Sequence, residues 1–489
     1  MGPPHPIHQG GRFVKTRVSW CFAVLALVLL VLLPWQTATA AVLWDTGNLA
    51  KVYDPAGSRY AYAPAVIREG NTEHMWTCHN EEDGVIKDSI YYTRIENGVV
   101  AESHPVLQAG ATGTWDSFHV CDPTVIAGKF LFQGTEYNYA LFYLGNDLNM
   151  SAHNQIGVAF ATELSGEWVK YPDPIVAYPN DGYWGVGQPS ATSVDGQGRL
   201  LLFFTKGDAA ATGGYRIDMN LRDMSDPVIG DAVPLTTNGL TDANGQPDWL
   251  NNFDITYDPS RDRFIAIREL HPYPSTQPNY ISESLQIVSI DGGSVWGGGG
   301  TWKVEGVLGS PQTGFPRNHN GGLLRTVNGM LPDPTAVEAY FTDSDAAPNL
   351  SGRAEYTYDI WRIKGTLNDA DIVTEKKLEH FKSSHFAVSS MTLNATSNQI
   401  GIQGMLDLKK IKPWLNETVW IGYRVYDAKG NLTDAGTAYR DAADASGAFR
   451  ISFPKPKGLA HDEGRLEVYL LNAKGKPIDS AASKVTFSF

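Results

Sequence analysis

The sequence predicts an all-β protein in which a five-bladed β-propeller is followed by a C-terminal β-sandwich. Residues 45–380 show little helical periodicity and consist of short β-branched and aromatic runs separated by Gly, Asn, Asp and Pro. The same order of runs recurs five times across this region. From about residue 384 the pattern changes to alternating strands with hairpin-type turns.

Each of the five repeats opens with a run that leads into an apolar second strand. The opening runs are YAPAVI, CDPTVI, GQPSAT, FDITYD and HNGGLL. Aligning them gives one opening position per repeat, namely Ala63, Asp122, Gln188, Asp254 and Asn320. The first interval is 59 residues and each of the next three is 66. Because each blade of a propeller buries its faces against its neighbours, five units of about four strands suit this fold, whereas a two-sheet sandwich does not explain a repeat of this length.

We assign residues 41–383 to the propeller, as the expected catalytic domain, and residues 384–489 to a β-sandwich accessory domain. The C-terminal region contains runs such as ETVWIGYRVYDAKGNL and GRLEVYLLNAKGKPIDS. None of its runs resembles a catalytic constellation. We therefore expect this domain to brace the propeller or to position it on a polymer.

Residues 1–40 read as a signal peptide. Three basic residues (Arg12, Lys15 and Arg17) precede the apolar run WCFAVLALVLLVLL, and small residues follow at Ala38 and Ala40. We expect cleavage after Ala40 and a secreted or periplasmic protein. The alternative is a membrane-anchored protein with an uncleaved segment, because the run is near the lower length limit for spanning a bilayer.

The composition indicates which class of molecule the protein binds. A formal net charge of -14 argues against nucleic acid, and against an anionic membrane surface beyond the export signal. The chain has 13 Trp, 22 Tyr and 19 Phe, and aromatic rings suit the apolar faces of sugars. A carbohydrate is therefore the expected partner, and the oligomeric state is open.

Two cysteines remain once Cys21 is removed with the signal. Cys78 and Cys121 both lie in strand-like runs. In an exported chain they form either a disulfide or two buried thiols, and the sequence leaves both alternatives open.

Polar residues gather at the strand ends that meet at one rim of a propeller. The first strand of each blade lines the central channel, and the second strand runs back to the same rim, farther from the axis. The opening positions therefore form an inner ring. The ends of the second strands form an outer ring that includes His79, Asn80, Asn146, Arg268, Glu269 and Asp343. The strands between these residues are apolar, which marks the shared funnel as the expected functional site.

The repeat region resembles the arabinanase and fructosidase superfamily, to which glycoside hydrolase families 43, 32, 68 and 117 belong. The resemblance rests on Asp122-Pro123 at the start of an inner strand, on Gly-x-Trp turns in GEWVKY and GTWKVEG, and on five blades of this length. It covers residues 45–380 and implies cleavage of glycosidic bonds by a base or nucleophile, an acid, and an acidic residue that tunes the acid. Two positions depart from the family pattern, since Ala63 and Gln188 stand where acidic residues are expected.

The resemblance, together with the repeat, gives the candidate catalytic residues Asp122, Asp254, Glu269 and His319. We expect Asp122 to act as the base that activates water or to orient the sugar. Asp254 is then the second carboxylate, which tunes the acid or exchanges roles with Asp122. The proton donor is Glu269 or His319, and a histidine acid is what family 117 implies. Because Asp122 and Asp254 lie two blades apart, the wider carboxylate separation of an inverting enzyme is expected.

Further polar and aromatic residues around the funnel are candidates for substrate binding. They are His79, Asn80, His119, Gln188, Asn318, Asn320, Arg268 and Trp184. Each also has a structural interpretation, such as a histidine satisfied in a polar turn or a tryptophan packed between blades. No dedicated metal site or cofactor is predicted, although Asp122, Asp254, His319 and Asn320 could surround an axial calcium ion.

The expected function is therefore an exported glycoside hydrolase that cleaves a neutral or furanose-type polysaccharide or oligosaccharide by acid/base catalysis. A non-catalytic glycan-binding propeller of the cell envelope is the alternative, because Ala63 and Gln188 interrupt the acidic set. A scaffold for a cell-envelope assembly is a third interpretation. The sequence does not distinguish the sugar, its linkage, or endo from exo cleavage.

Overall fold

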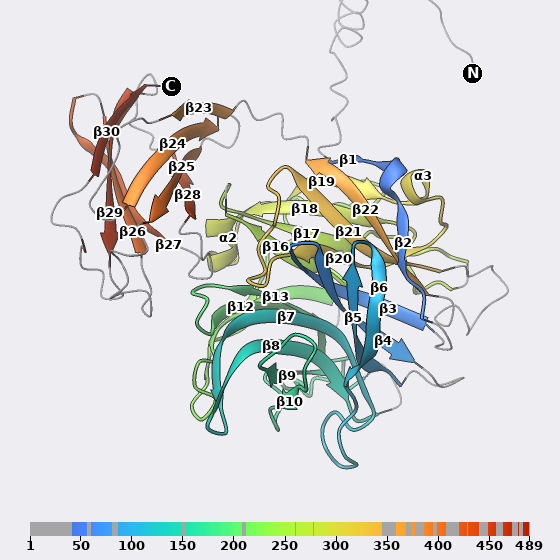
Figure 1. Ribbon diagram of the computed structural model, residues 1–489. Coiled ribbons are helices and arrows are strands. Elements are labelled where there is room, and N and C mark those ends of the chain that lie inside the picture. Colours follow the sequence, from blue (N-terminus) through green and yellow to red (C-terminus); the bar gives the residue numbers. More distant parts are fainter. Residues whose placement is uncertain are drawn as a thin grey trace, which may run out of the picture. The chain divides into compact units, whose positions relative to one another are not determined.

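A computed structural model describes most of the repeat region and parts of the C-terminal region (Figure 1). The described residues are 42–55, 60–80, 87–148, 152–207, 212–259, 261–276, 278–344, 358–367, 373–377, 386–394, 399–406, 420–427, 429–439, 448–455, 463–471, 478 and 483–488. The predicted signal peptide lies outside them. The described residues are mainly β-strands, which confirms the all-β prediction. Among them, no helix has the length and apolar character needed to cross a membrane.

The strands of residues 42–367 form five antiparallel units. Unit 1 consists of β3 (Tyr60–Glu69), β4 (Thr72–Asn80), β5 (Ser89–Glu96) and β6 (Val99–Leu107). Unit 2 consists of β7 (His119–Phe132), β8 (Thr135–Asn146), β9 (Gln155–Ala161) and β10 (Val169–Lys170). Unit 3 consists of β11 (Val186–Ser193), β12 (Arg199–Gly207) and β13 (Thr212–Asn220), with β14 (Val228–Ile229) and β15 (Val233–Pro234) at its edge.

Units 4 and 5 complete the set. Unit 4 consists of β16 (Asp254–Asp258), β17 (Arg263–Glu269), β18 (Leu285–Asp291) and β19 (Lys303–Leu308). Unit 5 consists of β20 (Asn318–Arg325), β21 (Ala336–Asp343) and β22 (Asp359–Leu367). Three short helical turns connect strands, namely η1 (Thr46–Asn48), α2 (Gly292–Gly297) and α3 (Ser310–Thr313).

The N-terminal strands belong to unit 5, although they are farthest from it in sequence. β1 (Val42–Trp44) and β2 (Ala50–Tyr53) both pair antiparallel with β22, so blue and orange strands meet in Figure 1. Strand β20 also pairs in parallel with β3, which joins units 5 and 1 into one nine-stranded sheet. The first and last units of the repeat are therefore fastened to each other by main-chain hydrogen bonds.

The hydrophobic core is divided into clusters that lie between successive units. Ile126 and Leu202 belong to the cluster shared by units 2 and 3, and Phe203 and Ile255 to that shared by units 3 and 4. Further clusters join units 1 and 2, units 4 and 5, and units 5 and 1. The apolar contacts thus pass around all five units and return to the first.

The first strand of four units carries a bulge next to a residue with positive φ. A positive φ is unfavourable for residues other than glycine and often marks a functional turn. The residues at this position are Ala63 (φ 52°), Asp122 (φ 47°), Gln188 (φ 50°) and Asn320 (φ 44°). In unit 4 the corresponding residue is Asn252 (φ 45°), which lies two residues before the start of strand β16.

The sequence alignment of the fourth repeat is therefore wrong by two residues. Asp254 pairs with Ile267, which is the register that Ser190 has with Phe203 in unit 3. Asp254 thus corresponds to Ser190, two residues farther along the first strand than the position of Asp122 and Gln188. The proline that marks the repeat in units 1, 2 and 3 is replaced by Phe253 in unit 4, so the sequence offered no fixed point for this alignment.

Two further four-stranded sheets lie C-terminal to residue 367. One has the order β23-β24-β25-β28, formed by Val373–Lys377, Phe386–Asn394, Gln399–Leu406 and Ala448–Pro454. The other has the order β27-β26-β29-β30, formed by Leu432–Tyr439, Trp420–Asp427, Glu463–Leu471 and Ser483–Ser488. Both sheets have buried residues at alternate positions, such as Ile400 and Ile402 in β25 and Leu466 and Val468 in β29.

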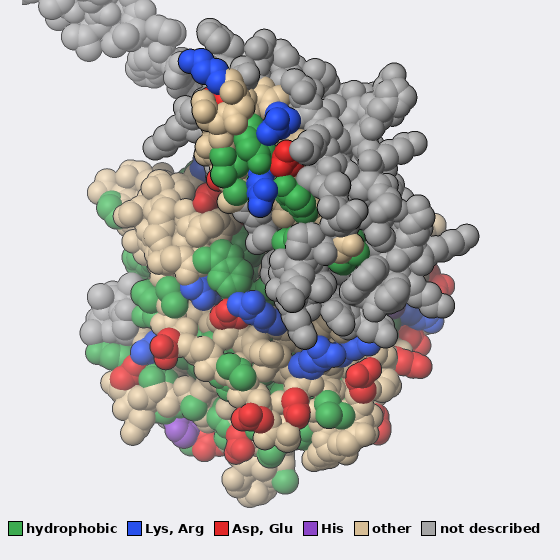
Figure 2. Space-filling model, turned by 90° about the vertical axis from the view of Figure 1, so that its left-hand side faces the viewer, with side chains coloured by type: hydrophobic (Ala, Val, Ile, Leu, Met, Phe, Trp, Pro, Cys, Tyr) green, Lys and Arg blue, Asp and Glu red, His purple; other side chains and the backbone are tan. Residues whose placement is uncertain are grey.

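Charged side chains of both signs lie on the face shown in Figure 2. Acidic side chains are scattered over the lower half of this view, and basic side chains lie mainly above them. The scattering of acidic groups agrees with the negative formal charge of the sequence.

Candidate active site

A cavity lies where the first strands of all five units converge. Its lining consists of the residues with positive φ and their neighbours, namely Ala63, Pro64, Ala65, Asp122, Pro123, Gln188, Pro189, Asn252, Phe253, Asp254, Asn320 and Gly321. The repeat therefore brings five turns from distant parts of the sequence to one place. Asp122 and Asp254 supply the carboxylates of this lining.

Asp122 lies in the cavity wall with an unusual electrostatic environment. The pKa of its carboxyl is raised from 3.8 to about 7, mainly by burial and also by the negative charge of Asp88. A hydrogen bond from the Gln188 backbone and the charge of His319 oppose this rise. A carboxyl with a pKa near neutrality can exchange protons at physiological pH, as a general acid or base must.

Asp88 is a buried acidic residue that the sequence did not single out. Its carboxylate accepts hydrogen bonds from Tyr60 (2.5 Å) and Tyr62 (2.7 Å), the tyrosines that flank Ala61 in β3. Its backbone amide donates to His119 Nδ1 over 3.1 Å. His119 therefore accepts a hydrogen bond at Nδ1, and burial lowers the pKa of its ring. This contact gives His119 a structural role in holding Asp88 beside Asp122.

Glu269 and His319 form a second polar group, contributed by units 4 and 5. His319 Nδ1 contacts Glu269 Oε1, which also accepts a hydrogen bond from Asn252 Nδ2 (2.7 Å). The hydroxyl of Tyr273 donates to Glu269 Oε2. Burial by itself raises the pKa of Glu269, but the charge and hydrogen bonds of its partners outweigh burial and lower the pKa overall. Glu269 is thus an ionised carboxylate with both oxygens engaged.

Asp254 lines the cavity and forms an ion pair with Arg325. Its Oδ1 lies 3.3 Å from Arg325 and accepts a hydrogen bond from Ser190 (2.6 Å), and its Oδ2 accepts one from the Leu323 amide (2.8 Å). Arg325 is 1% exposed and also donates to Thr124 over 2.7 Å. These contacts connect the first strands of units 2, 3, 4 and 5, so Asp254 has a clear structural function.

The residues proposed for an axial calcium ion do not offer a cation a favourable set of ligands. The guanidinium of Arg325 places a positive charge beside Asp254, and Glu269 contacts His319. Two other groups of potential metal ligands, Cys78–Cys121–Asp122 and Asp88–His119–Cys121, depend on cysteine sulfurs. Both sulfurs are bonded to each other and are therefore poor ligands. The calcium ion stays a prediction of the sequence alone.

The two cysteines form a disulfide bond that joins β4 of unit 1 to β7 of unit 2. Cys121 is the neighbour of Asp122 in sequence, and the Asp122 amide donates a hydrogen bond to Cys78 Sγ over 3.0 Å. The disulfide therefore fixes the backbone that carries Asp122. Of the two alternatives that the sequence left open, a disulfide or two buried thiols, the structure therefore shows the disulfide.

The predicted substrate-binding residues have different positions. Gln188 and Asn320 line the cavity. Arg268 and Asn318 are fully buried, and their side chains hold neighbouring loops through backbone carbonyls such as Thr241 O (2.8 Å) and Glu283 O (2.8 Å). These two contacts are structural.

The remaining predicted residues lie at the outer ends of second strands or in adjoining loops. His79 is stacked on Tyr91 with ring centroids 4.0 Å apart, and burial lowers its pKa to about 3. Asn80 is fully buried beside Tyr60 in the strand register. Trp184 is partly exposed and packs on Gly207, where a side chain would clash with the indole.

The sequence missed Asn252, Asp88 and Tyr273 as members of the site. Asn252 was hidden by the shifted alignment of repeat 4, although its neighbours Asn251 and Asp254 had marked this segment as polar. Asp88 and Tyr273 lie in loops outside the repeat pattern. No periodic signal could have placed them near the cavity.

Comparisons with known proteins find similar solved structures but no similar sequence. The sequence matches no protein-family model and no curated protein. A family 117 glycoside hydrolase from Zobellia galactanivorans is 12% identical with a TM-score of 0.46, covering 67% of this chain and 91% of that one. The α-L-arabinofuranosidase of Lactobacillus brevis is 11% identical with a TM-score of 0.45, covering 65% and 94%. A family 43 enzyme from Xanthomonas citri, complexed with xylotriose, is 14% identical with a TM-score of 0.42, covering 64% and 89%.

Proposed function

We propose that this protein is an exported glycoside hydrolase that cleaves a neutral or furanose-type polysaccharide or oligosaccharide with inversion. The five units are, in this proposal, the blades of a five-bladed β-propeller whose funnel is the active site. The two C-terminal sheets form a β-sandwich that braces the propeller or positions it on the polymer. The carrying observation is the carboxyl of Asp122, which lines the axial cavity and has a pKa of about 7.

Asp122 is the proposed general base. Its carboxylate removes a proton from a water molecule, and the water oxygen then attacks the anomeric carbon of the sugar. The raised pKa makes this carboxylate a stronger base than an ordinary aspartate. Asp122 and His319 come from units 2 and 5, which are not adjacent, and an inverting enzyme needs room for water between its acid and base.

His319 is the proposed general acid, and Glu269 is its positioning residue. A protonated imidazole gives its proton to the glycosidic oxygen as the bond to the anomeric carbon breaks. The ionised Glu269 carboxylate contacts Nδ1 of this ring, which fixes its orientation and leaves Nε2 to face the substrate. Because Glu269 is already bonded to Asn252 and Tyr273, it is less suited to donate a proton itself.

A non-catalytic glycan-binding protein is the second candidate. The five turns at the cavity carry Ala63, Asp122, Gln188, Asn252 and Asn320, so one carboxylate and three amides stand at the turns themselves. The other carboxylate of the lining, Asp254, is paired with Arg325. Amide side chains bind sugar hydroxyls well because each offers a donor and an acceptor. This composition favours binding over an acidic catalytic set.

Sugar release from arabinans, fructans, galactans and xylans separates the two candidates. The wild-type protein, Asp122→Asn and His319→Asn are compared, with the exposed Glu283→Gln as a matched control. Release by wild type and control, with loss in the other two folded variants, supports the hydrolase. Retention of a glycan without release by any variant supports the binding protein. The anomer formed first, observed by NMR, tests inversion.

A further inference from the structure

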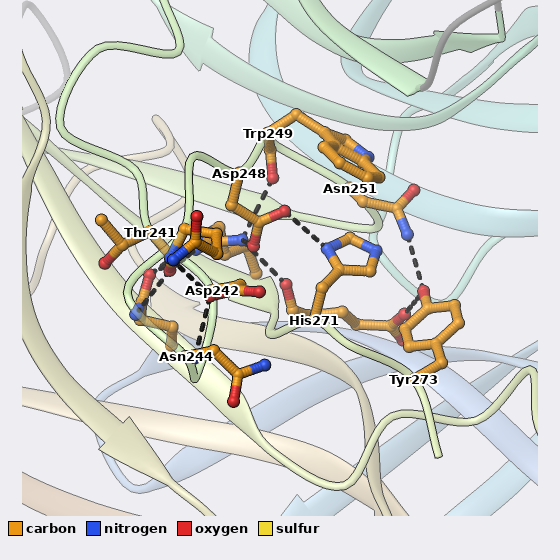
Figure 3. A network of polar contacts seen from close by, with 12 residues as sticks. Thr241, Asp242, Asn244, Asp248, Trp249, Asn251, His271 and Tyr273 are labelled. Carbon is orange, nitrogen blue, oxygen red and sulfur yellow. Dashed lines mark hydrogen bonds and ion pairs between the residues drawn. The ribbon is translucent and has the colours of Figure 1, made fainter. Parts of the chain in front are cut away.

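Three aromatic rings gather at the rim of unit 4, outside the cavity lining. Trp249 and His271 have ring centroids 4.5 Å apart, and His271 and Tyr273 have centroids 4.8 Å apart (Figure 3). Trp249 is partly exposed, as are His271 and Tyr273. The catalytic scheme above uses neither Trp249 nor His271. An exposed aromatic surface of this kind is suited to the apolar face of a sugar ring.

Three polar atoms of this group make no hydrogen bond to any described residue. They are Trp249 Nε1, His271 Nε2 and Asn251 Oδ1, whereas the other polar atom of each His and Asn side chain is engaged. In Figure 3 the indole nitrogen, the outer ring nitrogen and the Asn251 amide lie on the same side of the group. His271 Nδ1 donates to the Asp248 carboxylate, which leaves Nε2 for a ligand. The indole N–H is a donor, the Asn251 carbonyl oxygen is an acceptor, and the imidazole Nε2 is a third polar atom beside them.

The group is held rigidly by a buried charge. Arg268 is completely buried and donates to Asp248 Oδ2 (2.5 Å) and to the Trp249 carbonyl (3.1 Å). It also donates to the Thr241 carbonyl (2.8 Å), which fixes the loop that leads to Trp249. The unpaired atoms are therefore presented in one arrangement, and little entropy is lost when a ligand binds.

The group is continuous with the proposed catalytic residues. Asn251 Nδ2 donates to the Tyr273 hydroxyl (2.6 Å), and this hydroxyl donates to Glu269. The next residue, Asn252, lines the cavity and donates to the same carboxylate. A chain of sugars with one residue in the cavity would therefore reach Trp249 with an adjacent residue.

We propose that Trp249, His271 and Asn251 form a subsite for a further neutral sugar residue of an oligosaccharide or polysaccharide. The rings stack on the apolar face of the sugar, and the three unpaired atoms bind its hydroxyl groups. A neutral sugar is preferred because the nearby ionised carboxylates, Asp248 and Glu269, would repel an acidic one. This subsite rests on the proposed function, since it presumes that a glycan occupies the cavity.

Binding is tested separately from cleavage in an Asp122→Asn background. The probes are arabino-, fructo-, galacto- and xylo-oligosaccharides of two and of five residues, titrated by calorimetry. The variants are Trp249→Ala and Trp249→Phe. Trp296→Ala is the matched control, because this exposed tryptophan is in α2, at the opposite end of unit 4.

The expected result is that a pentasaccharide binds more tightly than the matching disaccharide and that Trp249→Ala weakens pentasaccharide binding by about tenfold. Trp249→Phe, which retains a ring but lacks the N–H, should lose less, and Trp296→Ala should lose nothing. Equal binding of both lengths, an unchanged affinity in folded Trp249→Ala, or no binding of any probe overturns the subsite. Sugar release by the wild-type protein is measured separately. If sugar is released but the affinity does not depend on Trp249, only the subsite is contradicted. If binding depends on Trp249 but no sugar is released, only the hydrolase is contradicted.

Discussion

His319 Nδ1 lies in contact with Glu269 Oε1, which joins the first strand of unit 5 to the second strand of unit 4. Glu269 is 1% exposed, so its charge is stabilised by hydrogen-bond donors and by the imidazole instead of by water. Both charges act on the carboxyl of Asp122, because Glu269 raises the pKa of Asp122 and His319 lowers it. The three residues therefore form one electrostatic system.

The activity of the proposed hydrolase should depend on the ionisation of Asp122. A base must be deprotonated, so kcat/KM should rise about tenfold for each pH unit as the pH approaches 7 from below. Initial rates of sugar release between pH 4 and pH 9 measure this profile. Full activity at pH 5 would contradict the assignment of Asp122 as the base.

Asp122 should also make folding stability depend on pH. The carboxyl ionises near pH 3.8 in the unfolded chain and near pH 7 in the folded protein, so the folded state binds more protons between these values. Stability contributed by the protonated form is therefore lost as pH rises from about 4 to 7, by at most about 4 kcal/mol. Exposure to the cavity reduces this figure.

Asp122→Asn should remove the pH-dependent loss while keeping the positive φ, which Asn tolerates. Thermal unfolding at several pH values should show the variant gaining stability relative to wild type between pH 4 and pH 7. Asp173→Asn, at an exposed position, serves as the control. A constant difference between variant and wild type would argue against a raised pKa.

Glu269→Gln should lower kcat with little change in KM. The amide keeps the size of the carboxylate but removes the negative charge that contacts and orients the His319 ring. We expect a loss of at least about 100-fold in kcat, the scale of acid catalysis. Steady-state kinetics of the folded variant measure this loss, and an unchanged kcat would remove Glu269 from the mechanism.

Arg325→Met should destabilise the protein by about 3–5 kcal/mol, because it leaves the partly buried Asp254 without its counter-charge. The double variant Arg325→Met with Asp254→Asn should recover part of this loss. Urea unfolding of the single and double variants tests the coupling. If Asp254→Asn instead abolishes turnover without affecting stability, Asp254 is the second catalytic carboxylate that the sequence predicted.

Removing the disulfide should destabilise the native state. Cys78 and Cys121 are 43 residues apart, and closing a loop of this length stabilises a protein by about 4 kcal/mol in the chain-entropy model. The double substitution to serine should therefore lower the urea midpoint. Wild type under reducing conditions provides the comparison, and equal midpoints in all three samples would contradict the role given to this bond.

The repeat could be found in the sequence because its signals are local. Proline after Ala63, Asp122 and Gln188, and alternating apolar strands after each, are consequences of the backbone geometry at each turn. The alignment of the repeats failed in unit 4, where this proline is missing. Phe253 replaces the proline in repeat 4, and Asp254 was aligned where Asn252 belongs.

The sequence by itself determined the strands, their repeat, and the polar character of the turns that line the cavity, because these depend on residues close together in the chain. Tertiary structure alone decided which polar groups meet. Asp88 approaches Asp122 from a loop, Arg325 neutralises Asp254 from another unit, and Tyr273 donates to Glu269. Charges and hydrogen bonds act through space, so the pKa of Asp122 and the pairing of Glu269 with His319 depend on contacts between units that no local pattern encodes.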